Sequence, residues 1–274
     1  MRFFLKVLPI ALSALFFCGC SDISTRGPDI LLDGSADGIQ AQAPEESIAA
    51  DSDDAEAQTS DSDAAVQQGQ ITVNLPQQYK GYYFTNGDKR FLSDCVFFGD
   101  SVCKGLSSYD FIPAVRCFAK AGVAARNITD FTFELNGEEI SFEEALTQTG
   151  AKHVVFSMGM NDLNMTDEAQ YAENYLALLD KAAEIRPDVD FYVMAISPVT
   201  VDSQFAYNSR INKFNQTLGD AVADRENCRF VDAGTELKND NGALHEAFCA
   251  DDQGVHLTAA AYYGILWTLC QAAA

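Results

Sequence analysis

The chain has 274 residues, with 18 basic and 40 acidic side chains and a formal net charge of −22. This charge excludes electrostatic docking on nucleic acid, which requires a basic surface, and on anionic lipid, which attracts clusters of lysine and arginine. Hydrophobic residues make up 47% of the chain, so a globular core can form. The length allows one large domain or two small ones, at roughly 100–200 residues each.

The charge divides the chain into three segments. The first twenty residues carry Arg2 and Lys6 and no acid. Residues 21–70 carry twelve acids and a single base, Arg26, while the remainder holds the other 28 acids and 15 bases. A basic start, a strongly acidic middle and a milder remainder predict three segments with separate roles.

An apolar run from residue 7 to residue 18 follows the charged start. It is too short to span a membrane, which takes about 20 residues, and it is typical of a secretion signal. The run ends in Cys18-Gly19-Cys20, which resembles the lipobox of bacterial lipoproteins. The resemblance implies a signal peptide over 1–20 and a lipid on Cys20 that anchors the chain at the extracellular face of the membrane. The alternative is an ordinary cleaved signal, in which Cys20 has no role.

Residues 21–77 are predicted to be a disordered, acidic tether. The segment is rich in Asp, Ser, Ala, Gln and Gly, and its acids are densest over 51–63. Such a composition buries too little apolar surface to offset the entropy of ordering the chain, and its like charges repel one another. Cation binding by the acidic cluster is a weaker alternative, because the glycine turn and terminal Glu of a calcium loop are missing.

Residues 78–274 are predicted to form one domain in which apolar strands alternate with helices. The run 95–98 predicts a first strand and 115–119 a second. Asn136-Gly137 in the middle of 131–140 is typical of a hairpin turn. A capping box over 141–144 opens a helix.

The same alternation continues to the end of the chain. Three further strands are predicted over 153–158, 191–196 and 229–231, and helices over 166–187, 203–225 and 258–270. Apolar strands that alternate with helices are typical of a parallel sheet covered on both faces. We therefore expect an α/β fold built on a five-stranded parallel sheet.

Ligands of such a sheet bind beyond the carboxyl ends of its strands. The polar residues predicted at that edge are Ser101 after the first strand, Gly122 after the second, Asn161 after the third and His256 after the fifth. His153 starts its strand and faces the opposite end, while His245 shares the long loop of His256 and is a second candidate.

These residue types suit acyl transfer. A serine hydroxyl becomes a nucleophile when a base removes its proton, and a histidine on the same edge supplies that base. The tetrahedral intermediate needs hydrogen-bond donors to its oxyanion, and each donor stabilises the transition state by about 3 kcal/mol. The backbone N–H groups of Ser101 and Gly122 and the side-chain amide of Asn161 are the candidate donors.

Four sequence blocks at these positions resemble those of the SGNH, or GDSL-type, hydrolases. They are Phe98-Gly99-Asp100-Ser101-Val102, Gly122, Gly159-Met160-Asn161-Asp162 and Gly254-Val255-His256-Leu257, in the family's order. The resemblance covers residues 90–274 and implies a flavodoxin-like, three-layer α/β/α sandwich without a cofactor. It also implies Ser101 as nucleophile, His256 as general base, and Gly122 and Asn161 in the oxyanion hole. Asp162 is expected to hold the loop that presents Asn161.

One position departs from the family pattern. The family usually has an Asp three residues before the histidine, where this chain has Gln253. We expect Asp252 to orient His256 through a one-residue loop insertion. The alternative is a Ser-His dyad oriented by Gln253 or by a backbone carbonyl, which is expected to be slower because no carboxylate stabilises the imidazolium.

The sequence therefore predicts a membrane-tethered extracellular serine esterase. Its location favours O-acetyl groups on cell-wall or other polysaccharide as substrates. An O-acetyltransferase on the same fold and a non-catalytic glycan-binding surface lipoprotein are the alternatives. No metal site is predicted, because the cysteines lack paired spacing and the three histidines are too few and too far apart. The expected partners are an ester substrate and the membrane, reached through the lipid, and the chain is expected to be a monomer.

Overall fold

The computed structural model describes residues 82–274. Cys20, the predicted signal peptide, the whole of the predicted tether and its boundary with the domain at residue 78 lie outside the described residues. Five parallel strands form the central sheet: β1 (Cys95–Gly99), β2 (Cys117–Ala119), β5 (His153–Ser157), β6 (Asp190–Met194) and β7 (Cys228–Val231). They lie in the order β2-β1-β5-β6-β7. This is the flavodoxin-like order, so the predicted fold class is confirmed.

The central strands are apolar because both faces of the sheet are covered. All five residues of β1 are buried. The ring of Phe98 in β1 contacts aromatic rings from β2, β3, α3 and β5, namely Phe118, Phe133, Phe142 and Phe156. A strand buried on both faces has no polar alternation, which is why the sequence shows continuous apolar runs.

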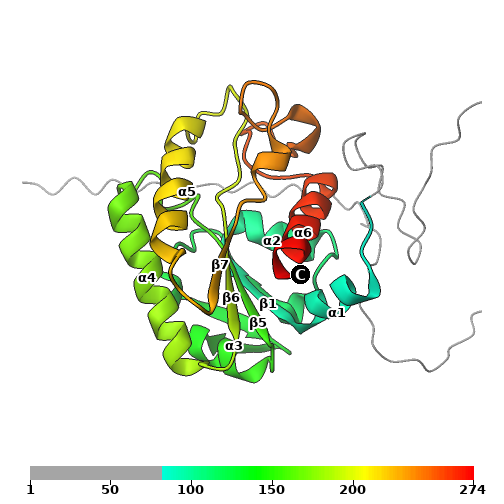
Figure 1. Ribbon diagram of the computed structural model, residues 1–274, viewed down its shortest axis with the longest axis vertical. Helices are drawn as coiled ribbons and strands as arrows, with labels where there is room; N and C mark the ends of the chain where they lie inside the picture. The colour runs from blue at the N-terminus through cyan, green and yellow to red at the C-terminus, as the bar shows by residue number, and fades with distance from the viewer. Residues whose placement is uncertain (1–81) are drawn as a thin grey trace, which may run out of the picture.

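Six α-helices of the described residues cover the sheet. They are α1 (Asn86–Asp94), α2 (Ser101–Ser108), α3 (Phe142–Gln148), α4 (Glu168–Ile185), α5 (Asn208–Val222) and α6 (Ala259–Ala273). Figure 1 shows α3, α4 and α5 on one face of the sheet and α1, α2 and α6 on the other, which gives three layers. The predicted hairpin is β3 (Thr132–Leu135) and β4 (Glu138–Ser141), joined by Asn136 and Gly137, both with positive φ.

Several element boundaries differ from the sequence prediction. Strand β2 starts at Cys117 because a short 3₁₀ turn occupies residues 114–116. Helix α4 begins after Asp167, whose carboxylate accepts the N–H of Gln170. Helix α5 begins at Asn208, later than predicted, because the preceding residues form a loop in which Ser203 donates a hydrogen bond to another loop. Helix α1 was not predicted, although Thr85 and Asp88 form a capping box at its start.

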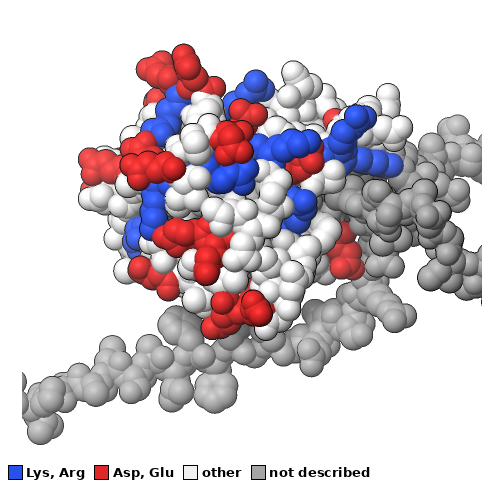
Figure 2. Space-filling model, turned by 90° about the horizontal axis from the view of Figure 1, so that it is seen from below, with Lys and Arg blue, Asp and Glu red and all other residues white. Residues whose placement is uncertain are grey.

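The surface carries charges of both signs. Figure 2 shows acidic and basic side chains interspersed in small groups on the face seen from below. Within residues 82–274, no helix combines the length and apolar character needed to cross a membrane.

Candidate active site

Ser101 lies at the start of α2, directly beyond the carboxyl end of β1. Asp100 caps this helix, because its carboxylate accepts the N–H groups of Val102 at 2.9 Å and Cys103 at 3.4 Å. Gly99 allows the sharp turn: a Cβ there would lie 2.0 Å from the carbonyl oxygen of Ser157. The hydroxyl of Ser101 therefore sits at the positive end of a helix, where developing negative charge is stabilised.

The Asp100 carboxylate also joins two of the loops that carry candidate site residues. It is only 2% exposed, and it accepts the N–H of Gly159 at 3.3 Å, in the loop that follows β5. Burial raises the pKa of Asp100 to about 6, although the N–H groups that it accepts favour the charged form. One buried side chain thus fixes the position of Ser101 relative to the loop that carries Asn161.

Asn161 and its neighbour join the loop after β5 to the loop after β2. The Asn161 amide donates to the carbonyl oxygen of Val123 at 2.9 Å, next to Gly122 in the chain. The Asp162 carboxylate accepts the N–H of Ala125 at 3.1 Å. Asp162 therefore ties the loop of Asn161 to the loop of Gly122. Gly122 adopts a φ of +84°, which favours glycine over other residues.

Asp162 forms an ion pair with Arg126 in addition to accepting the N–H of Ala125. Its side chain is fully buried and lies 2.8 Å from the guanidinium of Arg126. Burial raises the pKa of Asp162, against the opposing effect of the Ala125 N–H and the Arg126 guanidinium. Losing the arginine would leave a buried carboxylate with fewer partners, which is costly.

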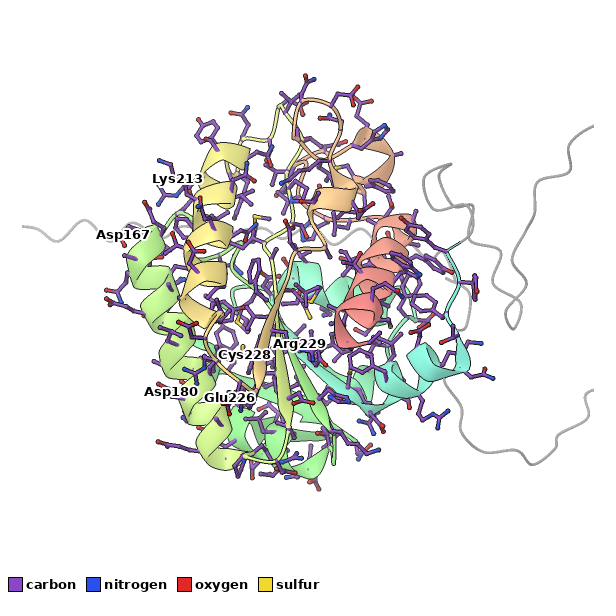
Figure 3. The ribbon with its side chains drawn as sticks, in the orientation of Figure 1. Asp167, Asp180, Lys213, Glu226, Cys228 and Arg229 are labelled. Carbon is purple, nitrogen blue, oxygen red and sulfur yellow. The ribbon has the colours of Figure 1, made fainter. Side chains whose placement is uncertain are left out.

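We expect Arg126→Ala to lower the free energy of unfolding by about 1–3 kcal/mol, because a charged group stays buried without its cation. Arg225→Ala is the matched control, because both arginine side chains are 27% exposed. Their partners differ: the side chain of Asp180, which pairs with Arg225, is 64% exposed, whereas that of Asp162 is 0% exposed. Figure 3 shows Asp180 on α4, on the flank of the sheet. An exposed pair contributes roughly 0–1 kcal/mol. Urea denaturation measures both, and equal losses would contradict the role given to Arg126.

His256 contacts Ser101 and a carboxylate at the same time. Its Nε2 lies 3.1 Å from the Ser101 Oγ, and its Nδ1 lies 2.5 Å from the Asp251 Oδ2. The other oxygen of Asp251 accepts the backbone N–H of Val255 at 3.0 Å and of His256 at 3.2 Å. Partial burial disfavours the charge on Asp251, but these hydrogen bonds outweigh it and lower its pKa. An ionised Asp251 accepts from Nδ1, so Nε2 is left free to accept the Ser101 proton.

The expectation that Asp252 orients His256 is wrong, because Asp251 occupies that position. Residues 251–254 form a tight turn in which the N–H of Gly254 donates to the Asp251 carbonyl oxygen at 3.2 Å, and Gly254 has a φ of +72°. The first residue of such a turn directs its side chain back over the following backbone. The two central residues, Asp252 and Gln253, are exposed. The orienting acid therefore stands five residues before the histidine.

The remaining candidates have other contacts. His245 caps a short 3₁₀ turn (Glu246–Phe248), where its Nδ1 accepts the N–H of Ala247 at 3.1 Å. The backbone carbonyl of Gln253 accepts the Ser203 hydroxyl at 2.8 Å. The contact of Ser101 with His256, and of His256 with Asp251, involves neither Gln253 nor His245.

A cavity of about 570 Å³ lies beside the Asp251 loop. It is formed between the loop after β6 and the long loop that precedes α6. Side chains with hydrogen-bonding oxygen atoms dominate its lining: Thr200, Asp202, Asn239, Glu246, Asp251 and Asp252. Such a cavity suits a ligand rich in hydroxyl groups.

The model of the GDSL-like lipase/acylhydrolase family matches residues 97–263. Among solved structures, a protein from Streptococcus pneumonia, provisionally assigned as a platelet activating factor, is 17% identical with a TM-score of 0.53, over 68% of this chain and 90% of that one. A GDSL-like lipase from Bacteroides thetaiotaomicron is 17% identical with a TM-score of 0.49, over 65% and 86%. An acetylxylan esterase from Geobacillus stearothermophilus is 16% identical with a TM-score of 0.46, over 65% and 92%. The comparison with curated proteins gives no match.

Proposed function

We propose that this chain, which belongs to the GDSL-like lipase/acylhydrolase family and is a serine ester hydrolase, removes O-acetyl groups from polysaccharide. In this proposal Ser101 is the nucleophile and His256 is the general base. The observation that carries this proposal is the continuous contact from the Ser101 hydroxyl through His256 to Asp251, at 3.1 Å and 2.5 Å. These are the distances over which a serine is activated by a base that a third group orients.

The first half of the reaction forms an acetyl-enzyme. The Ser101 oxygen attacks the acetyl carbonyl carbon while the His256 Nε2 takes the hydroxyl proton. The negative charge that develops on the carbonyl oxygen is stabilised by the N–H groups of Ser101 and Gly122 and by the Asn161 amide. The tetrahedral intermediate then collapses, and His256 returns its proton to the departing sugar oxygen.

The second half releases acetate. His256, neutral again, takes a proton from water, and the resulting hydroxide attacks the acetyl carbonyl bound to Ser101. The same donors stabilise the second oxyanion. Collapse expels the Ser101 oxygen, which regains its proton from His256, so the chain returns to its starting state.

The cavity beside Asp251 supports a polysaccharide substrate over a lipid ester. Its lining carboxylates, amide and hydroxyl accept or donate hydrogen bonds, as sugar hydroxyls require. A long acyl chain would gain little there, because apolar binding depends on apolar walls. A sugar bound in this cavity would lie close to the residue that orients His256.

The N-terminal segment supports a location at the extracellular face of a bacterial cell membrane. Its lipobox-like cysteine, Cys20, would carry the lipid, and the acidic residues that follow would form a tether to the domain at 78–274. The domain would then act as a monomer near the cell wall, where O-acetylated glycan is present.

The test is product analysis with the full chain. We expect acetate release from acetylated xylan or O-acetylated peptidoglycan, and a kcat/KM for an aryl acetate at least tenfold higher than for an aryl palmitate, because a polar cavity does not stabilise a long alkyl chain. Acetate is measured enzymatically and the aryl alcohol by absorbance.

Two controls define the outcomes. A parallel reaction contains an unacetylated oligosaccharide as acceptor: acetylated acceptor in place of acetate would establish the transferase. Preference for the palmitate would contradict the polysaccharide assignment while leaving the serine esterase intact. Absence of turnover with every ester would favour the glycan-binding alternative.

A further inference from the structure

Two cysteines lie against each other beside the nucleophile. Cys103 is in the first turn of α2, two residues after Ser101, and Cys117 opens β2. The Cys117 thiol donates to the backbone oxygen of Cys103 at 3.7 Å, and each thiol shifts the pKa of the other. We propose that Cys103 and Cys117 form a reversible disulfide that ties the nucleophile helix to the edge of the sheet.

The packing of α2 explains why the two side chains meet. Cys103 is buried, and its side chain lies over Gly99, where a Cβ would come within 2.4 Å of the Cys103 Cβ. Because β1 pairs with β2 in register, with Phe97 opposite Cys117, the start of β2 lies beside the strand that leads into α2. A disulfide requires two cysteines on neighbouring elements whose side chains approach each other, and the contact of the Cys117 thiol with Cys103 brings these two elements together.

The two thiols have different reactivity. Hydrogen bonds from Cys103 and from Ser107, together with the charge of Lys104, lower the pKa of Cys117 despite its burial. The same hydrogen bond to Cys117, together with burial, raises the pKa of Cys103. Cys117 is also the more exposed thiol, since it lies on the edge strand and is only partly buried. Cys117 is therefore the attacking thiolate and Cys103 the resolving thiol.

The oxidant is a small disulfide such as oxidised glutathione. The Cys117 thiolate attacks one sulfur of that disulfide, which breaks the bond and releases one glutathione thiolate. The Cys103 thiol loses its proton to the released thiolate and attacks the mixed disulfide, which releases the second glutathione. The protein loses two protons and two electrons in total, and one oxidised glutathione becomes two reduced molecules.

The bond would act on the site through two elements. Helix α2 carries Ser101, and β2 leads into the loop of Gly122. The disulfide closes a segment of 15 residues from Cys103 to Cys117, which restricts the unfolded chain. We expect the oxidised protein to melt at a Tm roughly 5–10 °C above that of the reduced protein.

The experiment exposes the reduced full chain to oxidised glutathione, alkylates the remaining thiols and maps the peptides by mass spectrometry. We expect a linked peptide pair that contains Cys103 and Cys117, lighter by two hydrogens than the sum of its parts and separated again by a reductant. Cys117→Ser is expected to abolish both the linkage and the Tm difference. Cys249→Ser is the matched control, because Cys249 is also partly buried but its Sγ lies 3.1 Å from the Asp251 carbonyl oxygen instead of another thiol.

Three results would overturn the proposal. They are full alkylation of both cysteines after oxidation, a stable glutathione adduct on Cys117 without closure, and linkage of either residue to a different cysteine. Cys103 is buried, so its replacement can prevent folding. Both variants are therefore made at Cys117 on the edge strand, and Cys117→Ala is the second of them. Its Tm must then be the same with and without the oxidant.

Discussion

Replacing Ser101 with alanine is expected to lower kcat for an aryl acetate by on the order of 10⁶-fold, because the proposed mechanism forms the acyl-enzyme on the Ser101 hydroxyl. The His256 ring and the Asp251 carboxylate would remain in contact, so the variant would keep its fold and its substrate affinity. Initial rates measure the loss, and a fluorophosphonate probe reports whether position 101 is the labelled nucleophile.

Ser108→Ala is the control for this substitution. Ser108 lies at the end of the same helix, is exposed, and donates its hydroxyl to the Lys104 carbonyl oxygen at 3.2 Å. Removing that hydroxyl should leave both the rate and the labelling unchanged. Labelling that persists in Ser101→Ala would assign the nucleophile to another residue, and a parent chain that resists the probe would contradict serine catalysis.

The sequence was sufficient to predict the fold class and the edge at which the site lies. The central strands β1, β5 and β6 are built on buried apolar runs, and the carboxyl ends of parallel strands meet at one edge. Position relative to those ends therefore separates Ser101 and His256 from His153, which starts β5. The same reasoning places Asn161 beside the loop of Gly122, where the structure shows it bonded to Val123.

The orienting acid could not be predicted by counting residues back from the histidine. The family spacing indicates the third position before His256, but here the turn over 251–254 lengthens the loop and reverses the chain. The relevant signal was local: Asp is favoured at the first position of a β-turn and Gly at the fourth, which are the places of Asp251 and Gly254. Which acid reaches His256 depends on the geometry of this turn, and the residue spacing of a motif does not encode that geometry.

Long-range pairs were also beyond the sequence. Arg126 and Asp162 meet because two loops from different strands converge, and nothing near either residue indicates the other. The pairing of Cys103 with Cys117 depends on how closely α2 packs over Gly99. Both contacts follow from tertiary packing, so local pattern predicts the elements but not these partners.

Asp251→Asn is expected to lower kcat by roughly 10⁴-fold with little change in KM, because the amide reverses the tautomer of His256. The asparagine Oδ1 can still accept the N–H groups of Val255 and His256, so the turn is preserved. Its Nδ2 would then donate to the His256 Nδ1, which places the ring proton on Nε2. A histidine protonated at Nε2 donates to the Ser101 hydroxyl and cannot remove its proton.

Asp252→Asn is the control that separates the two neighbouring acids. Asp252 is exposed and lines the cavity, so its replacement should leave kcat for an aryl acetate within about threefold of the parent, the range expected for a surface change. Urea denaturation would verify that both variants fold equally well. If the two variants lose the same activity, the pairing of Asp251 with His256 is not the orienting contact. If neither loses activity, a Ser-His dyad held by the backbone accounts for catalysis, and the loop over 251–254 contributes only to binding.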